Sequence, residues 1–427
     1  MTNYDYLYKK EYYGESLYKH YEVKKELGYQ LIKNGVILPY KRTEKGPGGG
    51  VIDGKGEFIG STSLHNCCGC RYDFPKIEKH EGAAVIYLGM FHGIWGHCLT
   101  DNIRRLWFLK SSAYIEKFSQ CRLVFVPMED FKFEESNRKL LEILGFCADD
   151  FLPVTGITQF DTIILPDESF FTPDGDLRYF TEEYRAMIDQ VRDYAREHRR
   201  AAPYKKVYFS YRNYTHFKQF GEERLEQYFH SKGYKVLYPE KLTFEEQLNV
   251  LINCDCFAST IGSCSHNILF LRDRANVILI PRANYLTGYQ ITLDQVHDLD
   301  ITYIDATLSL FAARCPWEGP FYYFVSSRLM DYFKDERKKD RKYWAESFKG
   351  FKMYAVHGLN YGRGANAKAY QYYSDTAAAC LDQFNRASRW TRVKRVMMKA
   401  LIFMGRRLEI LKLPKAKGLG RQIRRHG

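Results

Sequence analysis

Short apolar runs alternate along the chain with segments in which apolar residues recur at helical spacing. The near-continuous apolar runs predict strands at residues 83–89, 121–127, 161–166, 205–211, 234–239, 254–260, 275–281 and 301–306. Helical spacing is found at residues 97–117, 136–145, 222–232, 243–253 and 263–272, and a long amphipathic stretch covers about 180–200. Buried strands that alternate with helices are typical of parallel sheets covered on both faces. The pattern therefore predicts an α/β protein.

The predicted strands form two series, one on each side of the amphipathic stretch. We expect two doubly wound, Rossmann-like domains that face each other across a cleft, at residues 1–170 and 171–320, with ligands at the carboxyl ends of the strands. The segment at 34–53, which contains GPGGG, is interpreted as loop-rich, and it is no phosphate-binding loop because it lacks the GxxxxGK[ST] and GxGxxG patterns. Residues 321–385 form an extension that the pattern does not place.

The segment FHGIWGHCLTDNIRRLW, at residues 91–107, combines two histidines, an acid and two arginines. Apolar residues recur at helical spacing from His97 onward, and this spacing leaves Arg104 and Arg105 for solvent. His97 and Asp101 are four residues apart, so a helix places them on one face, where their side chains can converge. Two interpretations remain open: an active-site pair, or a core histidine beside an acid that the helix dipole favours near the first turn.

Two turns that follow strands carry groups suited to a ligand that contains phosphate. Arg212 follows the strand at 205–211, and its fork of donors matches a diphosphate, although a surface arginine in a loop would give the same pattern. The second turn, in STIGSCSHNILFL, precedes a helix whose N-terminal N–H groups could bind an anion. Its candidate binding residues are Gly262, Ser263, Ser265, His266 and Asn267. The alternative is a plain serine cap with the histidine packed inside.

The helix at 243–253 begins with Thr243 and Glu246, which have the spacing of a capping box. This structural role explains Glu246 completely. Glu245 and Gln247 have no such explanation, so both are candidates for contacts with a ligand.

Cysteine usage and hydropathy indicate a protein of the cytoplasm. The eleven cysteines are scattered, as is typical of reduced thiols, and the first residues lack the apolar run of a signal peptide. No run of about 18 apolar residues is present that would span a membrane. The segment LHNCCGCRY offers His65, Cys67, Cys68 and Cys70, but no second pair of ligands follows to complete a zinc site.

The order of these motifs resembles glycosyltransferase family 61, in its bacterial capsular-polysaccharide branch. The resemblance covers about residues 48–310 and rests on GGGVID, YLGMFHGIWGHCLTDNIRRLW, VYFSYRN and GEERLEQYFHSKGYKVLYPEKLTFEEQLNVLINCDCFASTIGSCSHNILF. Many members have G-x-H-G-A before the last motif helix, whereas here the histidine is shifted to His266. The family implies a GT-B arrangement of two Rossmann-like domains, a nucleotide-sugar donor, inversion at the anomeric carbon, and no bound metal or other cofactor.

The resemblance also assigns roles to the candidate residues. His97 and Asp101 would be the catalytic pair of an acceptor-side domain at 1–170, with one of them as the general base. Arg212 and the turn at 262–267 would bind the donor in the domain at 171–320. The alternative is a non-catalytic protein that has kept the fold and binds a nucleotide sugar or a glycan.

All of the net positive charge lies near the C-terminus. Residues 386–427 contain 14 Lys or Arg and one acid, Glu409, so this segment alone accounts for the net charge of +13. The rest of the chain is balanced, which argues against a nucleic-acid partner. Residues 386–413 place an apolar stripe opposite a basic face, which predicts an amphipathic helix on an anionic membrane surface, although such a helix could also pack on the body. We therefore expect a cytoplasmic protein, peripheral at the inner face of the cytoplasmic membrane, and the resemblance implies that it acts on a glycan or lipid-linked acceptor.

Overall fold

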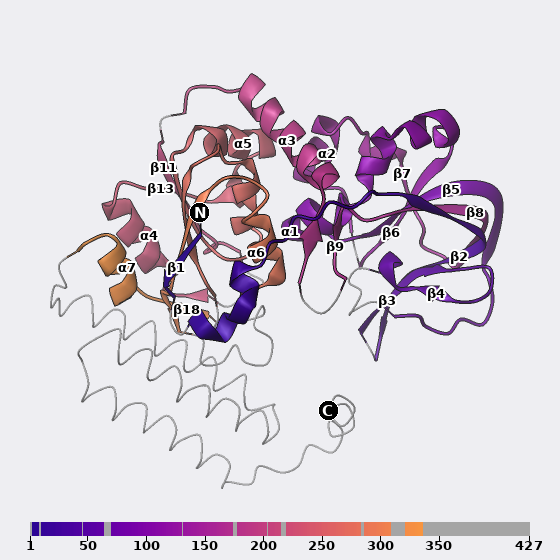
Figure 1. The fold of residues 1–427 in the computed structure, drawn as a ribbon, viewed down its shortest axis with the longest axis horizontal. Coiled ribbons are helices and arrows are strands. Elements are labelled where there is room, and N and C mark those ends of the chain that lie inside the picture. The colour runs from indigo at the N-terminus through magenta and orange to yellow at the C-terminus, as the bar shows by residue number, and fades with distance from the viewer. Residues whose placement is uncertain are drawn as a thin grey trace, which may run out of the picture. The chain divides into compact units, whose positions relative to one another are not determined.

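A computed structural model gives the fold of the chain (Figure 1). It describes residues 2–335 with the exception of 8–9, 45, 64–69, 130, 174–176, 203, 215–218, 283–285 and 309–320. The expected basic tail at 386–427, most of the extension at 321–385, and the candidate zinc ligands His65, Cys67 and Cys68 lie outside the described residues. The chain divides into two compact units, and the first contains residues 1–214, 226–281 and 285–304.

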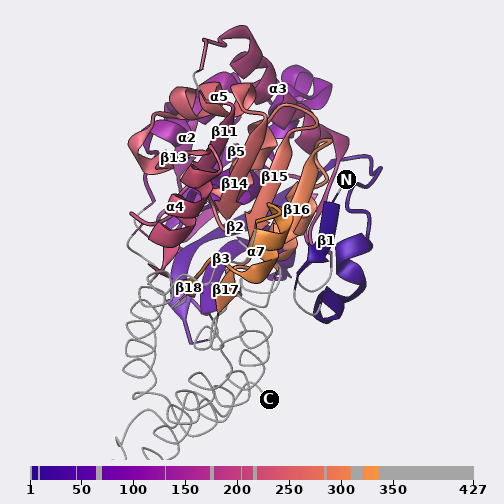
Figure 2. The ribbon, with the colours of Figure 1, turned by 90° about the vertical axis from the view of Figure 1, so that its left-hand side faces the viewer.

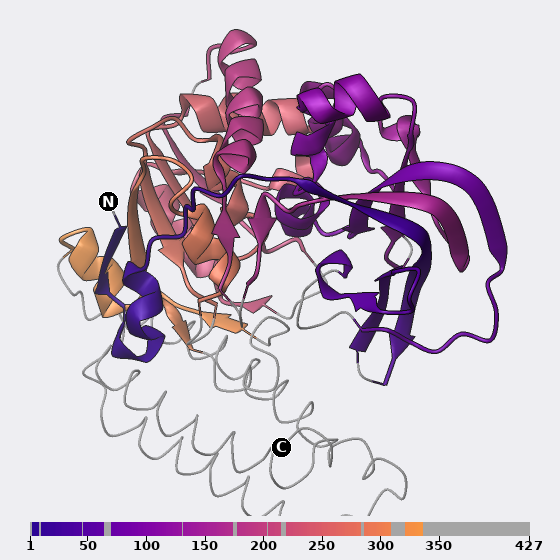
Figure 3. The same ribbon diagram turned by 45° about the vertical axis from the view of Figure 1, so that its right-hand side comes forward.

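One sheet of the first unit has seven strands in the order β4-β3-β2-β8-β5-β6-β7. Its strands are β2 (Tyr29–Thr43), β3 (Gly46–Ile52), β4 (Phe58–Ile59), β5 (Lys79–Phe91), β6 (Arg122–Pro127), β7 (Phe151–Pro153) and β8 (Thr158–Pro166). The four strands from β8 to β7 are parallel, and β4, β3, β2 and β8 pair antiparallel. The long strands β2, β5 and β8 curve strongly at the right of Figure 3.

The interpretation of residues 34–53 as loop-rich is wrong, because β2 and β3 form a long hairpin there. The apolar residues Val36 to Leu38 and Val51 are buried in it. The glycines serve close packing: a Cβ on Gly50, whose φ is 132°, would lie 2.6 Å from Thr62 Oγ1. The run of glycines, whose pattern predicts a loop, is therefore a strand covered by a neighbouring segment.

A second sheet of the same unit has six strands in the order β1-β16-β15-β14-β11-β13, and every pair is parallel (Figure 2). The strands are β1 (Thr2–Tyr6), β11 (Lys206–Phe209), β13 (Lys235–Leu237), β14 (Cys256–Thr260), β15 (Asn276–Ile280) and β16 (Asp300–Ile304). All eight predicted strands are present in the two sheets, so the α/β class and the parallel sheets are confirmed. The fold is compatible with a Rossmann-like glycosyltransferase, whereas the GT-B arrangement stays a prediction.

Both sheets lie within one compact unit and share a core, although the sequence analysis assigns them to separate domains divided near residue 170. Ile86 of β5 and Phe257 of β14 belong to the same buried cluster. The helices α2 (Glu135–Ile143), α3 (Glu182–Glu197) and α5 (Phe244–Asn253) pack against one another beside this core. The strand β1, from the start of the chain, pairs with β16 in the second sheet.

The expected helix at 97–117 is not a continuous α-helix. One turn of α-helix, α1 (Trp95–His97), runs into a π turn at Cys98–Asn102, and a 3-10 helix at Leu106–Lys110 and a second π turn at Tyr114–Phe118 follow. This changes which residues face inward, so Arg104 and Arg105 are buried rather than exposed to solvent. Likewise, the helix expected at 263–272 is a six-residue 3-10 helix, Ser265–Phe270.

The second unit contains a small sheet in the order β12-β18-β17, formed by β12 (Gln219–Phe220), β18 (Phe321–Tyr323) and β17 (Thr307–Leu308). The remaining helices are α4 (Glu222–Ser231), α6 (Gly288–Leu293) and α7 (Ser327–Tyr332), and β9 (Phe170–Phe171) pairs with β10 (Tyr179–Phe180) in a short hairpin of the first unit. Within the described ranges, none of the helices has the length and apolarity that crossing a bilayer requires.

Candidate active site

His97 and Asp101 lie just beyond the carboxyl end of β5 and contact each other directly. His97 Nδ1 is 2.6 Å from Asp101 Oδ2, across the π turn that joins them. The structure thus brings the two side chains together, as their spacing predicts. Only 3% of the Asp101 side chain is exposed, against 24% of the His97 side chain, so the imidazole is the member of the pair that a ligand can reach.

The Asp101 carboxylate is held by donors from three sides. Thr100 Oγ1 donates to Oδ2 at 3.1 Å, and the Tyr289 hydroxyl lies 3.1 Å from both carboxylate oxygens. The Arg104 guanidinium is 3.7 Å from Oδ1 and adds a positive charge. A buried carboxylate with these partners accepts a hydrogen bond from Nδ1–H of His97. This bond leaves the lone pair on Nε2 of His97.

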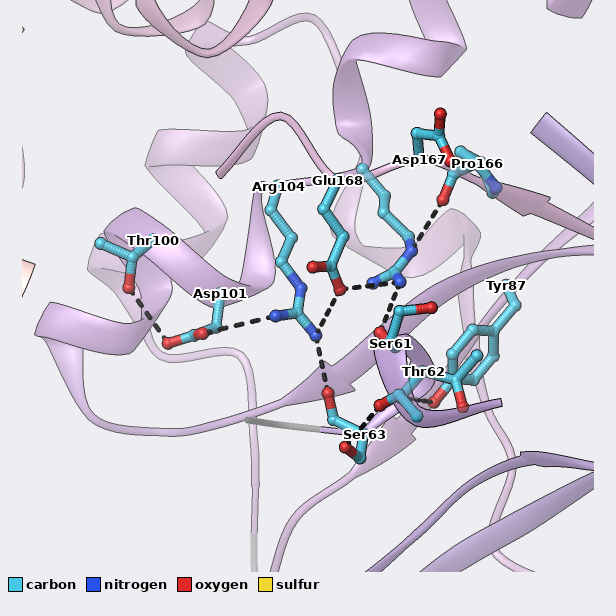
Figure 4. Close-up of polar contacts among 12 residues, drawn as sticks. Ser61, Thr62, Ser63, Tyr87, Thr100, Asp101, Arg104, Pro166, Asp167 and Glu168 are labelled. Carbon is cyan, nitrogen blue, oxygen red and sulfur yellow. Dashed lines mark hydrogen bonds and ion pairs between the residues drawn. The ribbon is translucent and has the colours of Figure 1, made fainter. Parts of the chain in front are cut away.

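Behind Asp101 lies a buried network of charges (Figure 4). Glu168 Oε1 is 3.2 Å from Arg104 Nη2 and 2.8 Å from Arg105 Nη2, and all three side chains are buried. Arg105 donates to the backbone carbonyl of Ser61 at 2.7 Å, and Arg104 donates to that of Ser63 at 2.8 Å. Between them, the carbonyl of Thr62 accepts from the Tyr87 hydroxyl at 2.9 Å. The network therefore ties the residues around Asp101 to the end of β8 and to a segment that precedes β5.

Sequence reasoning missed this network. A signal was present, because Asp167 and Glu168 follow a buried strand of the first series, at the edge where ligands and buried polar groups of a parallel sheet gather. Two adjacent arginines in a segment that is otherwise apolar need acidic partners when they are buried.

The turn after β14 is stabilised by its own polar groups. Gly262, with a φ of 148°, donates its N–H to Ser265 Oγ at 2.9 Å. The backbone N–H groups of Ser265 and Asn267 donate to Gly262 O at 2.9 Å and to Cys264 O at 3.3 Å. These N–H groups are used within the turn, and the helix that follows is a short 3-10 helix. The turn thus uses three of its N–H groups internally, and anion binding at this turn stays a prediction.

The same turn packs directly on the segment that carries His97. A Cβ on Gly96 would lie 2.9 Å from His266 Nδ1 and 3.1 Å from Ser263 Oγ. Trp95 Nε1 donates to Asn267 Oδ1 at 3.0 Å. Two motifs that the sequence analysis places in opposite domains thus meet at Gly96, and only a glycine fits between them.

Tyr289, on α6, is the residue that joins these parts. Its hydroxyl contacts Asp101, and its ring packs edge-on against His97 with centroids 5.7 Å apart and stacks on His266 at 6.4 Å. The Arg178 guanidinium lies over the ring, 4.5 Å from its centroid. Burial and the charge of Asp101 raise the pKa of Tyr289 well above its ordinary value, so the hydroxyl stays protonated and donates. No sequence motif singles out this residue among 34 tyrosines.

Arg212 lies beyond the end of β11, as predicted. Its Nε is 3.2 Å from Glu226 Oε1, and Nη2 donates to the Tyr238 hydroxyl at 3.0 Å. The side chain is 46% exposed, so the guanidinium still faces solvent in part.

The start of α5 shows both the strength and the limit of local sequence patterns. Thr243 and Glu246 form the predicted capping box, with reciprocal bonds of 3.2 and 2.8 Å. Glu245 pairs with Lys139 at 3.1 Å and accepts a hydrogen bond from a tyrosine of α3. Gln247 is buried and donates to two carbonyls of the preceding loop. The structure thus gives structural partners to the two residues for which the sequence analysis found none.

A comparison with protein families adds one finding to this geometry. Residues 95–278 match the family model described as Glycosyltransferase 61. This segment belongs to glycosyltransferase family 61. The family supports a glycosyltransferase activity, and donor and acceptor substrates with it. No curated protein sequence matches the chain.

The family segment includes most of the site but not all of it. His97, Asp101, Arg212 and the turn at 262–267 lie within residues 95–278, and Tyr289 lies beyond them. Within the part of the chain that the structure describes, no three His, Cys, Asp or Glu side chains gather so as to hold a metal ion. The expectation that the glycosyltransferase uses no metal or other cofactor stays a prediction.

Proposed function

We propose that the chain is an inverting glycosyltransferase in which the His97 imidazole is the general base. The observation that carries the proposal is the 2.6 Å contact between His97 Nδ1 and the buried Asp101 carboxylate. This contact fixes the tautomer whose Nε2 accepts a proton, and the partly exposed ring can approach an acceptor. The burial of Asp101 and the donors that already engage it argue against Asp101 as the base, and its proposed role is to orient His97 and stabilise the imidazolium.

The proposed reaction is a single displacement. The acceptor hydroxyl gives its proton to His97 Nε2 as its oxygen forms a bond to the anomeric carbon of the donor sugar. The bond from that carbon to the leaving phosphate oxygen breaks, and the electron pair departs with the nucleotide. The products are a glycoside of inverted configuration and the nucleotide, and His97 returns the proton to solvent.

The donor is proposed to be a nucleotide sugar whose phosphates are bound on the carboxyl edge of the second sheet. Arg212 supports this as a partly exposed guanidinium beyond β11, since such a group stabilises negative charge that develops on the leaving group. The turn at 262–267 contacts the segment of His97 and is proposed to lie near the sugar. Glu245 and Gln247 are not included, because their side chains already have structural partners.

The acceptor is proposed to be a glycan or a lipid-linked glycan intermediate of a cell-surface polysaccharide, such as a capsule. The support is the charge pattern of residues 386–413, which suits a helix on the anionic inner face of the cytoplasmic membrane. Reversal of Arg392, Arg395 and Lys399 to Glu in the full chain should abolish sedimentation with anionic vesicles. Reversal of three exposed body lysines, Lys55, Lys76 and Lys117, is the matched control. Equal sedimentation of the two variants would contradict membrane docking by this segment.

Turnover with UDP-, GDP- and CMP-sugars tests the enzymatic proposal. The protein should release nucleotide from one donor, slowly by hydrolysis and faster with an acceptor. His97→Ala should lower the rate by about 10²–10⁴-fold, and Asp101→Asn should lower it through the wrong tautomer of His97. His198→Ala, at an exposed histidine that follows α3, is the control. Tight binding of one donor without any release of nucleotide would instead indicate a non-catalytic binder.

A further inference from the structure

A second histidine, His92, lies beside the proposed base and has no role so far. It follows β5 directly and precedes the family segment. Its ring stacks on the His97 ring, with centroids 4.6 Å apart and planes inclined by 24°. The side chain of Asn102 fixes the backbone of His92 through two hydrogen bonds of 3.0 Å. Asn102 Oδ1 accepts from the N–H of His92, and Asn102 Nδ2 donates to the carbonyl of His92.

The two stacked rings carry their protons on opposite nitrogens. The backbone N–H of Ile94 donates to His92 Nδ1 at 3.0 Å, so in the neutral ring the proton is on Nε2. In His97 the Asp101 carboxylate holds the proton on Nδ1, which leaves Nε2 as an acceptor. Adjacent imidazoles therefore offer one N–H donor and one lone pair, each of them fixed by a neighbour within the fold.

The surroundings keep His92 neutral and within reach of a ligand. Burial, and then the neighbouring His97 ring, lower the pKa of His92 to about 4, against the opposing influence of Asp101 and Glu129. A neutral ring adds no positive charge beside the proposed base. Gly93 and Ile94, which follow His92, are exposed, so the loop is open to solvent on that side.

We propose that His92 and His97 together recognise two adjacent hydroxyl groups of the acceptor sugar. His97 Nε2 takes the proton of the attacking hydroxyl, and Nε2–H of His92 donates to the oxygen of its neighbour. The preferred acceptor is then a sugar with a vicinal diol, and His92 is a specificity-determining residue. This inference rests on the proposed function, because it assigns the acceptor side of the same site.

Substitutions at His92 separate the hydrogen bond from the stacking. His92→Phe keeps an aromatic ring on His97 but removes the donor, and His92→Gln restores an N–H donor without a ring. We expect His92→Phe to lower kcat/KM for the acceptor by about tenfold. His92→Gln should recover part of the loss. His198→Phe is the matched control, because His198 also stacks on a ring, that of Tyr194, at 4.0 Å.

An acceptor that lacks the neighbouring hydroxyl gives the decisive comparison. The wild type should prefer the diol acceptor over its monodeoxy analogue by about tenfold, and His92→Phe should treat the two alike. Wild-type discrimination that survives in His92→Phe would overturn the inference, while loss of turnover in His97→Ala would still support the proposed function.

Nitrogen-15 NMR of the histidine side chains provides a test that needs no turnover. At neutral pH the spectrum should show His92 protonated on Nε2 and His97 protonated on Nδ1, with resonances assigned by loss in His92→Phe and His97→Ala. Methyl glycosides with vicinal hydroxyls should shift the His92 signal. The opposite tautomer at His92, or no shift with any of these glycosides, would overturn the inference even if no nucleotide sugar is ever turned over.

Discussion

The Tyr289 hydroxyl contacts both carboxylate oxygens of Asp101, at 3.1 Å each, across 188 residues of the chain. Tyr289→Phe removes this donor and leaves the ring in place. We expect the free energy of unfolding to fall by about 1–3 kcal/mol, because the buried carboxylate loses a partner. The rate constant kcat should also fall, since Asp101 holds His97 less firmly. Urea denaturation and steady-state kinetics measure the two effects, and an unchanged kcat would show that Tyr289 does not act through Asp101.

Glu168 neutralises two buried arginines, Arg104 and Arg105, at 3.2 and 2.8 Å. Glu168→Gln leaves two buried positive charges opposite Asp101 alone, so we expect a loss of about 3–5 kcal/mol in the free energy of unfolding. Asp149→Asn breaks an exposed ion pair with Arg138 and should cost less than about 1 kcal/mol. Denaturant titrations of the two variants compare the costs directly. Equal losses would mean that the buried network contributes no more than a surface pair.

Gly96 is the point at which the two halves of the site touch. In Gly96→Ala the new methyl group would lie 2.9 Å from His266 Nδ1, so His266 or the α1 backbone must move. We expect the free energy of unfolding to fall by about 1–3 kcal/mol. The rate constant kcat should fall by more than the loss of folded protein explains, because His97 follows directly in sequence. Gly60→Ala, at a glycine with no atom within 4 Å of its Cβ position, is the control. Wild-type kinetics in Gly96→Ala would contradict tight packing at this contact.

Asp294 makes the stability depend on pH. Burial raises the pKa of its carboxyl to about 7, although hydrogen bonds from Gln290 and Tyr303 oppose this effect. Between about pH 4 and pH 7 the folded protein holds a proton that the unfolded chain releases. The contribution of Asp294 to the free energy of unfolding therefore falls as the pH rises, by up to about 1.4 kcal/mol per pH unit. Asp294→Asn should flatten this fall in denaturation curves from pH 4 to pH 8, whereas Asp298→Asn, at an exposed carboxyl, should not.

Sequence patterns predict those features of this protein that local spacing determines. The strands that are buried on both faces, the capping box at Thr243 and Glu246, and the meeting of His97 with Asp101 all depend on residues within a few positions of each other. Their physical causes are the period of the apolar residues, the burial of the strands and the geometry of a single turn.

Features that depend on distant partners could not be predicted in this way. Arg104 and Arg105 are buried because Glu168 lies beside them, and nothing in their own segment specifies that partner. Gln247 is fixed by the carbonyls of a loop whose path is set by tertiary structure. The glycines of β3 give the pattern of a loop, because a strand that lacks side chains shows no alternation of apolar and polar residues.

The pairing of β1 with β16 has a consequence for how the chain reaches its native state. Thr2 lies opposite Ile301, so the edge strand of the second sheet is made about 300 residues before its partner. During synthesis β1 has no sheet to join, and closing so large a loop makes this pairing a late and slow event. Until then the edge of β16 remains open to other strands, which makes the last stage of folding the one most vulnerable to aggregation. A bulky fusion placed directly before β1 would lower the yield of soluble protein for this reason, while the candidate active site itself stayed intact.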